Sequence, residues 1–332
     1  MKTLAPTPGR EKPQETSGTV IATSCSHLPR PRAKHVVLVY DATMNRGAVA
    51  IVDALGFKGI WGNVAKPSLA VLQTLKAIGA AAAIDVGKAA LLLDRRNLSD
   101  DVAMMLKNPF VRVVQLSDTI VVAAGRRPRL RKPWRRHAQA WRDKFGLTIE
   151  EFEAAVDSYL RFVVARCVCS ILKTAALCTP PLIYRGAVTV GRFAIDENFL
   201  LGPAVDEAAE LMDLADGPFV WLAPSANRLK DVITDSNGPK WSEMVFEYRV
   251  PLRDGREIPT HVLNPFFSCS ATDKKTVRGN ILRAMDKPLV DVAVKRGNTL
   301  RFFNHVTSKE KTESLLKAAR QKREAAPPAE GG

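Results

Sequence analysis

The sequence has few of the residues that build metal or redox centres. It contains five cysteines and five histidines among 332 residues. Cys167 and Cys169 form C-x-C, which is not the C-x-x-C spacing of zinc and redox sites. The histidines are scattered, without H-E-x-x-H spacing. The odd number of cysteines at loose spacings predicts reduced, mostly buried thiols, as in a cytoplasmic protein.

Long apolar runs and signal sequences are also missing. The longest apolar stretch, residues 77–93, is interrupted by Asp85 and Lys88. A membrane-spanning helix needs about 20 predominantly apolar residues. Residues 1–10 contain proline and charge but not the apolar region of a secretory signal. We therefore expect a cytoplasmic protein without a membrane span.

The composition supplies a hydrophobic core and an excess of positive charge. Hydrophobic residues make up 46% of the chain, which excludes disorder throughout. Lysine and arginine number 49 against 34 acidic residues, giving a net charge of +15. This balance favours anionic partners such as nucleotides, nucleic acid or a membrane surface, without choosing among them.

The order of apolar segments predicts an α+β fold. Strand-like and helical segments alternate unevenly, unlike the regular alternation of a doubly wound sheet. We expect a disordered basic leader over 1–34 and a main domain over 35–268, with a basic insertion at 125–147. A helical and strand extension is expected over 269–306, and a charged helix ending in a disordered tail over 307–332.

Several elements have specific local signals. Thr148 and Glu151 form a capping box that should begin a helix over 148–177. Ser117-Asp118 lies between two β-rich runs and predicts a hairpin. The remaining segments are strands at 35–40, 48–52, 184–190, 219–222, 241–252 and 260–263, and helices at 64–107 and 203–214.

Two aspartates follow or join buried strands. Asp53 ends an apolar run and is followed by a sharp Ala-Leu-Gly-Phe turn, whose N–H groups suit a phosphate. Asp118 lies at the tip of the expected hairpin. Two carboxylates on neighbouring rigid strands are what Mg²⁺ ions need to hold a triphosphate.

With a third segment, these motifs resemble the class III adenylyl and guanylyl cyclases. Asp53-Ala-Leu-Gly-Phe57 is similar to the family's D-x-x-G-F turn, and Ser117-Asp118 to its hairpin pair. Arg185 to Gly191 and Gly202 to Val205 are similar to its R-x-G-(I/V)-x-x-G strand and G-x-x-V helix start. The resemblance covers about residues 45–265.

The resemblance implies a ferredoxin-like cyclase-homology domain, with a central, mostly antiparallel sheet, acting as a homodimer on a nucleoside triphosphate. Asp53 and Asp118 would bind Mg²⁺ or Mn²⁺. The backbone N–H groups of Leu55, Gly56 and Phe57 would hold phosphates.

The chain departs from the family at four positions. Asp206 and Glu210 replace an Asn and an Arg on one helical face, so two acids stand where a neutral donor and a cation are expected. Val114 and Phe199 occupy the positions that read the base, and neither side chain offers it a hydrogen bond. Substitute cations would have to come from elsewhere, the candidates being Arg185, Arg192 and Lys295.

The basic insertion supports a different function. Residues 126–136 contain seven cations and Trp134, with Trp141 close behind, which suits nucleic acid as well as a solvated loop. Three interpretations therefore stay open. They are a divergent metal-dependent nucleotide cyclase, a cyclase-like nucleotide-sensing or dimerisation module without turnover, and a nucleic-acid-binding protein acting through residues 126–142.

Overall fold

A computed structural model describes most of the expected main domain and its C-terminal extension. The leader at 1–34, the strand expected at 35–40 and most of the basic insertion lie outside the described residues. Eight strands and seven helices are assigned within the described part of the chain. The described residues are 44–55, 67–91, 110–126, 139, 143, 146, 148–196, 199–229, 241–286 and 289–324.

The sheet is mixed and mostly antiparallel, which confirms the expected α+β class. Its centre is β1 (Asn45–Ala54), which pairs antiparallel with β3 (Thr119–Gly125) and with β4 (Tyr184–Asp196). β2 (Phe110–Leu116) forms the edge next to β3, giving the order β2-β3-β1-β4. β1 is buried on both faces, as expected of a central strand rich in Ala, Val and Ile.

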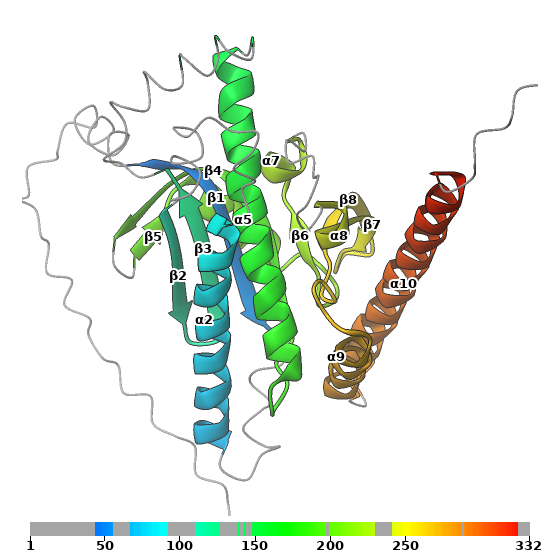
Figure 1. Cartoon of the computed structure of the whole chain (residues 1–332). Coiled ribbons are helices and arrows are strands. Elements are labelled where there is room, and N and C mark those ends of the chain that lie inside the picture. The colour runs from blue at the N-terminus through cyan, green and yellow to red at the C-terminus, as the bar shows by residue number, and fades with distance from the viewer. Residues whose placement is uncertain are drawn as a thin grey trace, which may run out of the picture. The chain divides into compact units, whose positions relative to one another are not determined.

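Two long helices cover one face of this half of the sheet. They are α2 (Pro67–Leu91) and α5 (Ile149–Leu177), which lie side by side in Figure 1. α5 begins at the predicted capping box, where the Thr148 hydroxyl accepts from the Glu151 N–H at 3.1 Å. α2 starts close to the expected position, and residues 92–107 of the predicted helix lie outside the described residues.

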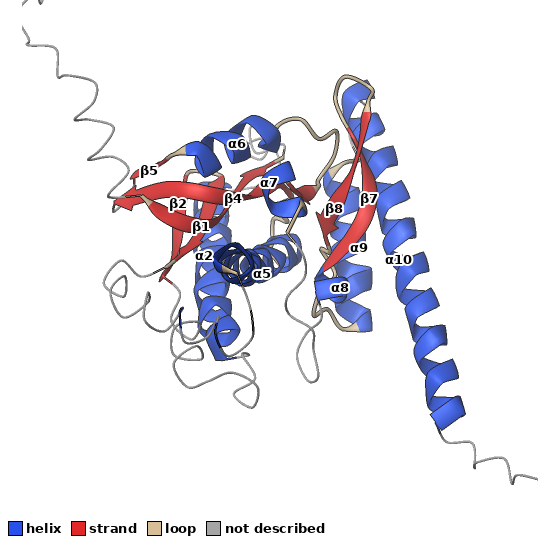
Figure 2. Cartoon of the chain, turned by 90° about the horizontal axis from the view of Figure 1, so that it is seen from above, coloured by secondary structure: helices blue, strands red, loops and turns tan. Residues whose placement is uncertain are grey.

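The opposite face is covered by α6 (Pro203–Met212). Alternate residues of β1 point to the two faces, so Val49 and Ile51 pack with Ala204 and Ala208 of α6. Gly191 in β4 allows this close approach, since a Cβ there would lie 3.3 Å from the Ala204 Cβ. Figure 2 shows α6 and α5 on opposite sides of the sheet.

The second half of the sheet continues from β4. β6 (Val220–Leu222) is parallel to β4, and β8 (Glu257–Leu263) joins it to the edge strand β7 (Val245–Pro251). The short elements are β5 (Phe199–Leu201), α7 (Pro224–Asn227) and α8 (Trp241–Met244). The strands predicted at 241–252 and 260–263 thus pair antiparallel as a hairpin.

The strand predicted over 241–252 is wrong in its first four residues. Trp241 to Met244 form one helical turn, α8, before β7 begins. Trp241 and Met244 are three residues apart and both buried, so a helical turn places both in the core against α5. Alternation along a strand would have sent them to opposite faces.

The C-terminal extension consists of two helices, α9 (Ala271–Ala284) and α10 (Val290–Glu324). Phe302, Phe303 and Val306 of α10 pack with Val277 and Ile281 of α9 in a second core cluster. The boundary expected at 306–307 falls inside α10, and the described residues of 269–306 contain no strand. No helix in the described residues is long and apolar enough to cross a membrane.

Candidate functional site

Asp53 lies near the end of β1, between two strands. In the sheet register it stands opposite Thr119 of β3 on one side and opposite Arg185 of β4 on the other. The Thr119 hydroxyl donates to Asp53 Oδ1 at 2.9 Å. The Asp53 side chain is 23% exposed, so solvent reaches it at this edge of the sheet.

Asp118 is carried to the same edge by the predicted hairpin. Leu116 pairs with Thr119, which leaves Ser117 and Asp118 as a two-residue turn. Ser117 has a φ of 59°, and positive φ at the first turn position is typical of tight hairpins whose twist matches the strands. Asp118 is thus next in the chain to the residue that pairs with Asp53. The structure brings the two predicted aspartates together.

The pKa of Asp53 is set by its burial and by the charged groups around it. Burial raises the pKa of Asp53 above its ordinary value, and the hydrogen bond from Thr119 opposes that effect. The neighbouring carboxylates of Asp118 and Asp213 raise the pKa further, while Arg185 lowers it. Two acidic groups therefore act on Asp53, and an additional cation would stabilise its ionised form.

Arg185 is the cation that the structure places beside Asp53. Its Nη2 lies 3.9 Å from Asp53 Oδ2 and forms a close ion pair with Asp213 at the end of α6. Only 8% of Arg185 is exposed. Its Nε and Nη1 are buried and have no hydrogen-bond partner among the described residues. Such donors are costly to leave unsatisfied.

A second guanidinium, that of Arg253, is held beside Asp213. The turn between β7 and β8 is joined to the segment after α6, since Arg253 N donates to Leu214 O at 3.0 Å and Asp216 N donates to Pro251 O at 2.8 Å. Arg253 Nη2 lies 3.7 Å from Asp213 Oδ1. Asp213 and Arg253 were missed from the sequence because no motif links them to Asp53.

The other two candidate cations lie elsewhere. Arg192 is opposite Arg46 in the sheet register, seven positions along β4 from Arg185 and so at the other end of the strand pair. Lys295 lies on α10 and forms an ion pair with Asp291 at 3.3 Å. Of the three cations that the sequence suggested, Arg185 is the one that contacts Asp53.

The remaining predicted site residues differ in their exposure and in their contacts. Asp206 and Glu210 are exposed on the outer face of α6. Val114 is 8% exposed and belongs to the cluster beneath α6. Phe199 begins β5, opposite Asp196. The Leu55 N–H donates to Ile183 O at 2.7 Å, so this group is already engaged within the protein.

Gly56 and Phe57, the other residues of the predicted phosphate turn, lie outside the described residues, as does most of the basic segment at 126–142. Arg126, its first residue, pairs with Glu153 at 3.1 Å and with Asp157 at 3.8 Å. The described residues therefore offer no observation that favours nucleic-acid binding by this segment.

Asp53 and Asp118 suit a hard cation whose remaining ligands come from water or from a bound phosphate. No group of three or more His, Cys, Asp and Glu residues able to hold a metal occurs in the described residues. Mg²⁺ is commonly bound by one or two carboxylates, with substrate phosphates and water completing its octahedron. Asp53 and Asp118 fit that pattern, and the donor set does not fit a closed zinc site.

The chain matches no protein-family model, and no curated protein matches it.

Proposed function

We propose that this protein binds a nucleoside triphosphate together with Mg²⁺ or Mn²⁺ at the edge of the sheet formed by Asp53 and Asp118. The observation that carries the proposal is the buried Arg185, whose Nη2 lies 3.9 Å from Asp53 Oδ2 and whose Nε and Nη1 have no acceptor within the described part of the chain. Carboxylates for a cation and an unsatisfied guanidinium for an anion are the complementary requirements of a metal–polyphosphate complex.

The strand order supports a ferredoxin-like, cyclase-like domain. β1, α2, β2, β3, α5 and β4 follow one another in the chain, and the sheet order is β2-β3-β1-β4 with antiparallel neighbours. This is a βαββαβ arrangement with its two long helices on one face. In such a domain the ends of the first strand and of the central hairpin meet, as Asp53 and Asp118 do.

Each residue has a distinct role in the proposed complex. The carboxylates of Asp53 and Asp118 hold the cation, and Thr119 orients Asp53 through its hydrogen bond. Arg185 supplies donors to a phosphate oxygen on the side of Asp53. Arg253, half exposed and held by Asp213, offers a second guanidinium to the outer part of the polyphosphate. The bound cation would neutralise phosphate charge.

Asp206 and Glu210 favour nucleotide sensing over rapid cyclisation. Both side chains are exposed on one face of α6. Acidic groups repel a polyphosphate, whereas an arginine that stabilises phosphoryl transfer contributes on the order of 10³–10⁵ in rate. We therefore expect binding of the nucleotide with little or no formation of a cyclic product.

The test is binding of each of the four nucleoside triphosphates with Mn²⁺ or Mg²⁺, measured by calorimetry and by the shift in melting temperature. The Asp53→Asn and Asp118→Asn variants are expected to lose the metal-dependent part of binding. Asp291→Asn is the charge-matched control, because Asp291 is exposed on α10 and belongs to a different ion pair. Mass spectrometry of the same samples measures any cyclic product.

Two results would contradict the proposal. One is the absence of binding by all four nucleotides with either metal. The other is equal binding by the wild type and by the Asp53→Asn, Asp118→Asn double variant, since the nucleotide would then bind elsewhere. Efficient cyclisation would retain the site but overturn the role assigned to Asp206 and Glu210.

A further inference from the structure

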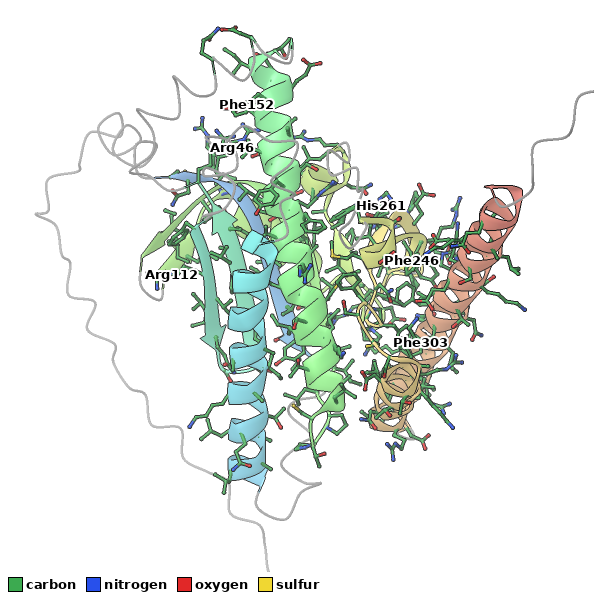
Figure 3. All side chains as sticks on the ribbon, in the orientation of Figure 1. Arg46, Arg112, Phe152, Phe246, His261 and Phe303 are labelled. Carbon is green, nitrogen blue, oxygen red and sulfur yellow. The ribbon has the colours of Figure 1, made fainter. Side chains whose placement is uncertain are left out.

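A cleft lies along the β7–β8 hairpin. β8 and β7 are the third and fourth strands from β1 in the sheet order, so the cleft is separate from Asp53 and Asp118. Its volume is about 580 Å³, which is in the range of small-molecule sites. In Figure 3, His261 appears on the α10 side of α5, away from α2. The polar residues of the lining include Asn227 of α7, Glu247 and Arg249 of β7, His261 of β8 and His305 of α10.

The strand register explains why the cleft is polar. Val245 and Leu263 are opposite each other and pack in the core that α5 covers. Glu247 and His261 are the next pair on the same face, since residues two apart on a strand point to the same side. Phe246 points to the other face, where it packs with α9 and α10. One face of the hairpin therefore leaves the core at Glu247 and His261.

Asn227 fixes the orientation of the His261 ring. His261 Nδ1 lies 2.6 Å from Asn227 Oδ1. An amide oxygen can only accept, so Nδ1 carries the proton and Nε2 of the neutral ring keeps a lone pair. The end of α7 is held in turn by Arg161, which donates to Ala226 O at 2.9 Å and to Leu229 O at 3.1 Å. The protein thus presents His261 Nε2 as an oriented acceptor.

Glu247 places a second acceptor beside this nitrogen. Its Oε1 lies 4.0 Å from His261 Nε2. The backbone of Glu247 is held from the other side, because His305 Nε2 donates to Glu247 O at 2.9 Å. A single ammonium nitrogen about 2.9 Å from each acceptor fits between the two atoms. The pair therefore suits a primary ammonium group.

Arg249 adds a positive charge on the same face, two residues from Glu247. It is exposed and forms no ion pair within the described part of the chain. Glu247 would repel a simple anion, and Arg249 would repel a simple polycation such as a polyamine. A ligand that carries both charges satisfies both residues. Pro259, opposite Arg249 in the register, gives the cleft an apolar surface.

We propose that this cleft binds a free amino acid, a small zwitterion with one ammonium and one carboxylate group. The ammonium group would lie between His261 Nε2 and Glu247, and the carboxylate would accept from the guanidinium of Arg249. The side chain of the ligand would contact Pro259. Because the Glu247 side chain is 83% exposed, solvent weakens the ionic contacts. We therefore expect a Kd between about 10 μM and 1 mM.

The first test is binding of each common amino acid, measured by ligand-observed NMR and then by calorimetry for those that bind. Glu247→Gln and Arg249→Gln are each expected to lower the affinity about 10-fold or more, because each removes a hydrogen bond between charged groups. Lys311→Gln and Glu313→Gln are the charge-matched controls, since both residues are exposed on α10 outside the cleft. All four positions are on the surface, and circular dichroism verifies folding.

Chemically blocked ligands test the orientation. N-acetylation removes the charge of the ammonium group, and a methyl ester removes that of the carboxylate. Each blocked ligand is expected to bind the wild type about 10-fold more weakly than the free amino acid. Acetylation should have little further effect in Glu247→Gln, and esterification little in Arg249→Gln, because the affected contact is already lost.

Three results would overturn the inference. They are the absence of binding by every amino acid at concentrations up to about 10 mM, equal affinities in the wild type and in both cleft variants, and blocked ligands that bind as tightly as free ones. Binding of Zn²⁺ but of no amino acid, lost in Glu247→Gln, would also overturn it and assign the two acceptors to a metal. Nucleotide binding should be unchanged in the cleft variants, and amino-acid binding unchanged in Asp53→Asn, so the two proposals fail separately.

Discussion

Replacing Arg185 with methionine tests the stability and the function of the candidate site together. Methionine keeps much of the apolar volume but removes the charge. At 3.9 Å from Asp53, the interaction energy is about 4 kcal/mol at an effective dielectric constant of about 20. The cost of burying the guanidinium, on the order of several kcal/mol, offsets much of this. We expect a net loss of about 1–3 kcal/mol in the free energy of unfolding at neutral pH.

In a thermal unfolding assay, this loss corresponds to a decrease of about 3–9 °C in the melting temperature. The decrease should depend on pH. Arg185 lowers the pKa of Asp53, so the variant has the higher folded-state pKa. The stabilisation by the ion pair is therefore present when Asp53 is ionised and is lost as pH falls through its folded-state pKa. The difference between wild type and variant should shrink on acidification.

The same Arg185→Met variant should change the affinities for nucleotide and for the metal ion in opposite directions. Nucleotide affinity is expected to fall about 10-fold or more, because a hydrogen bond to a charged group contributes about 1.5–3 kcal/mol. Binding of Mn²⁺ alone is expected to tighten, because a neighbouring positive charge is removed. Arg192→Met is the control on the same strand, at its other end. Equal melting temperatures and equal nucleotide affinities in the two variants would refute the role of Arg185.

Three further predictions concern the framework around the site. Gly186→Ala should lower the free energy of unfolding by about 3 kcal/mol or more, measured by denaturant titration, because the new Cβ would lie 2.1 Å from Ile51 O. Arg161→Met should cost about 3–5 kcal/mol in the same assay, since Arg161 donates to Ala226 O at 2.9 Å and Leu229 O at 3.1 Å and stacks on Trp241. Burial raises the pKa of Asp157 above 3.8, although Arg46 and Arg126 lower it. The wild type should therefore lose stability relative to the Asp157→Asn variant as pH rises from 3.8 through the folded-state pKa of Asp157. Melting curves of both proteins at several pH values would detect this loss.

Local signals predicted the parts of the fold that depend on a few adjacent residues. The hairpin at Ser117–Asp118 and the capping box at Thr148 each follow from residues within four positions of one another. The turn of α8 was missed because Trp241 and Met244 follow tertiary packing against α5 instead of strand alternation. The boundary predicted at 306–307 was also wrong, because α10 continues through it as one helix. A change in composition need not end a helix.

The candidate site could be predicted only in part for a related reason. Asp53 and Asp118 carry recognisable local patterns, and the sheet register brings them together. Asp213 has no pattern of its own and reaches Arg185 because α6 crosses the sheet and ends there. Arg253 arrives from a hairpin that follows in the chain. Such contacts are set by the packing of distant elements.

The charges around Asp53 show why an acidic cluster can occur in a chain with a net charge of +15. Asp53, Asp118 and Asp213 contribute three negative charges when ionised, and Arg185 and Arg253 contribute two positive charges. The local balance is then about −1, which attracts a divalent cation. Addition of that cation changes the balance to about +1, which attracts a polyphosphate. Neither ligand is expected to bind well without the other, because each supplies the charge that the other requires. Calorimetry should therefore show that Mn²⁺ and nucleotide increase each other's affinity by the same factor.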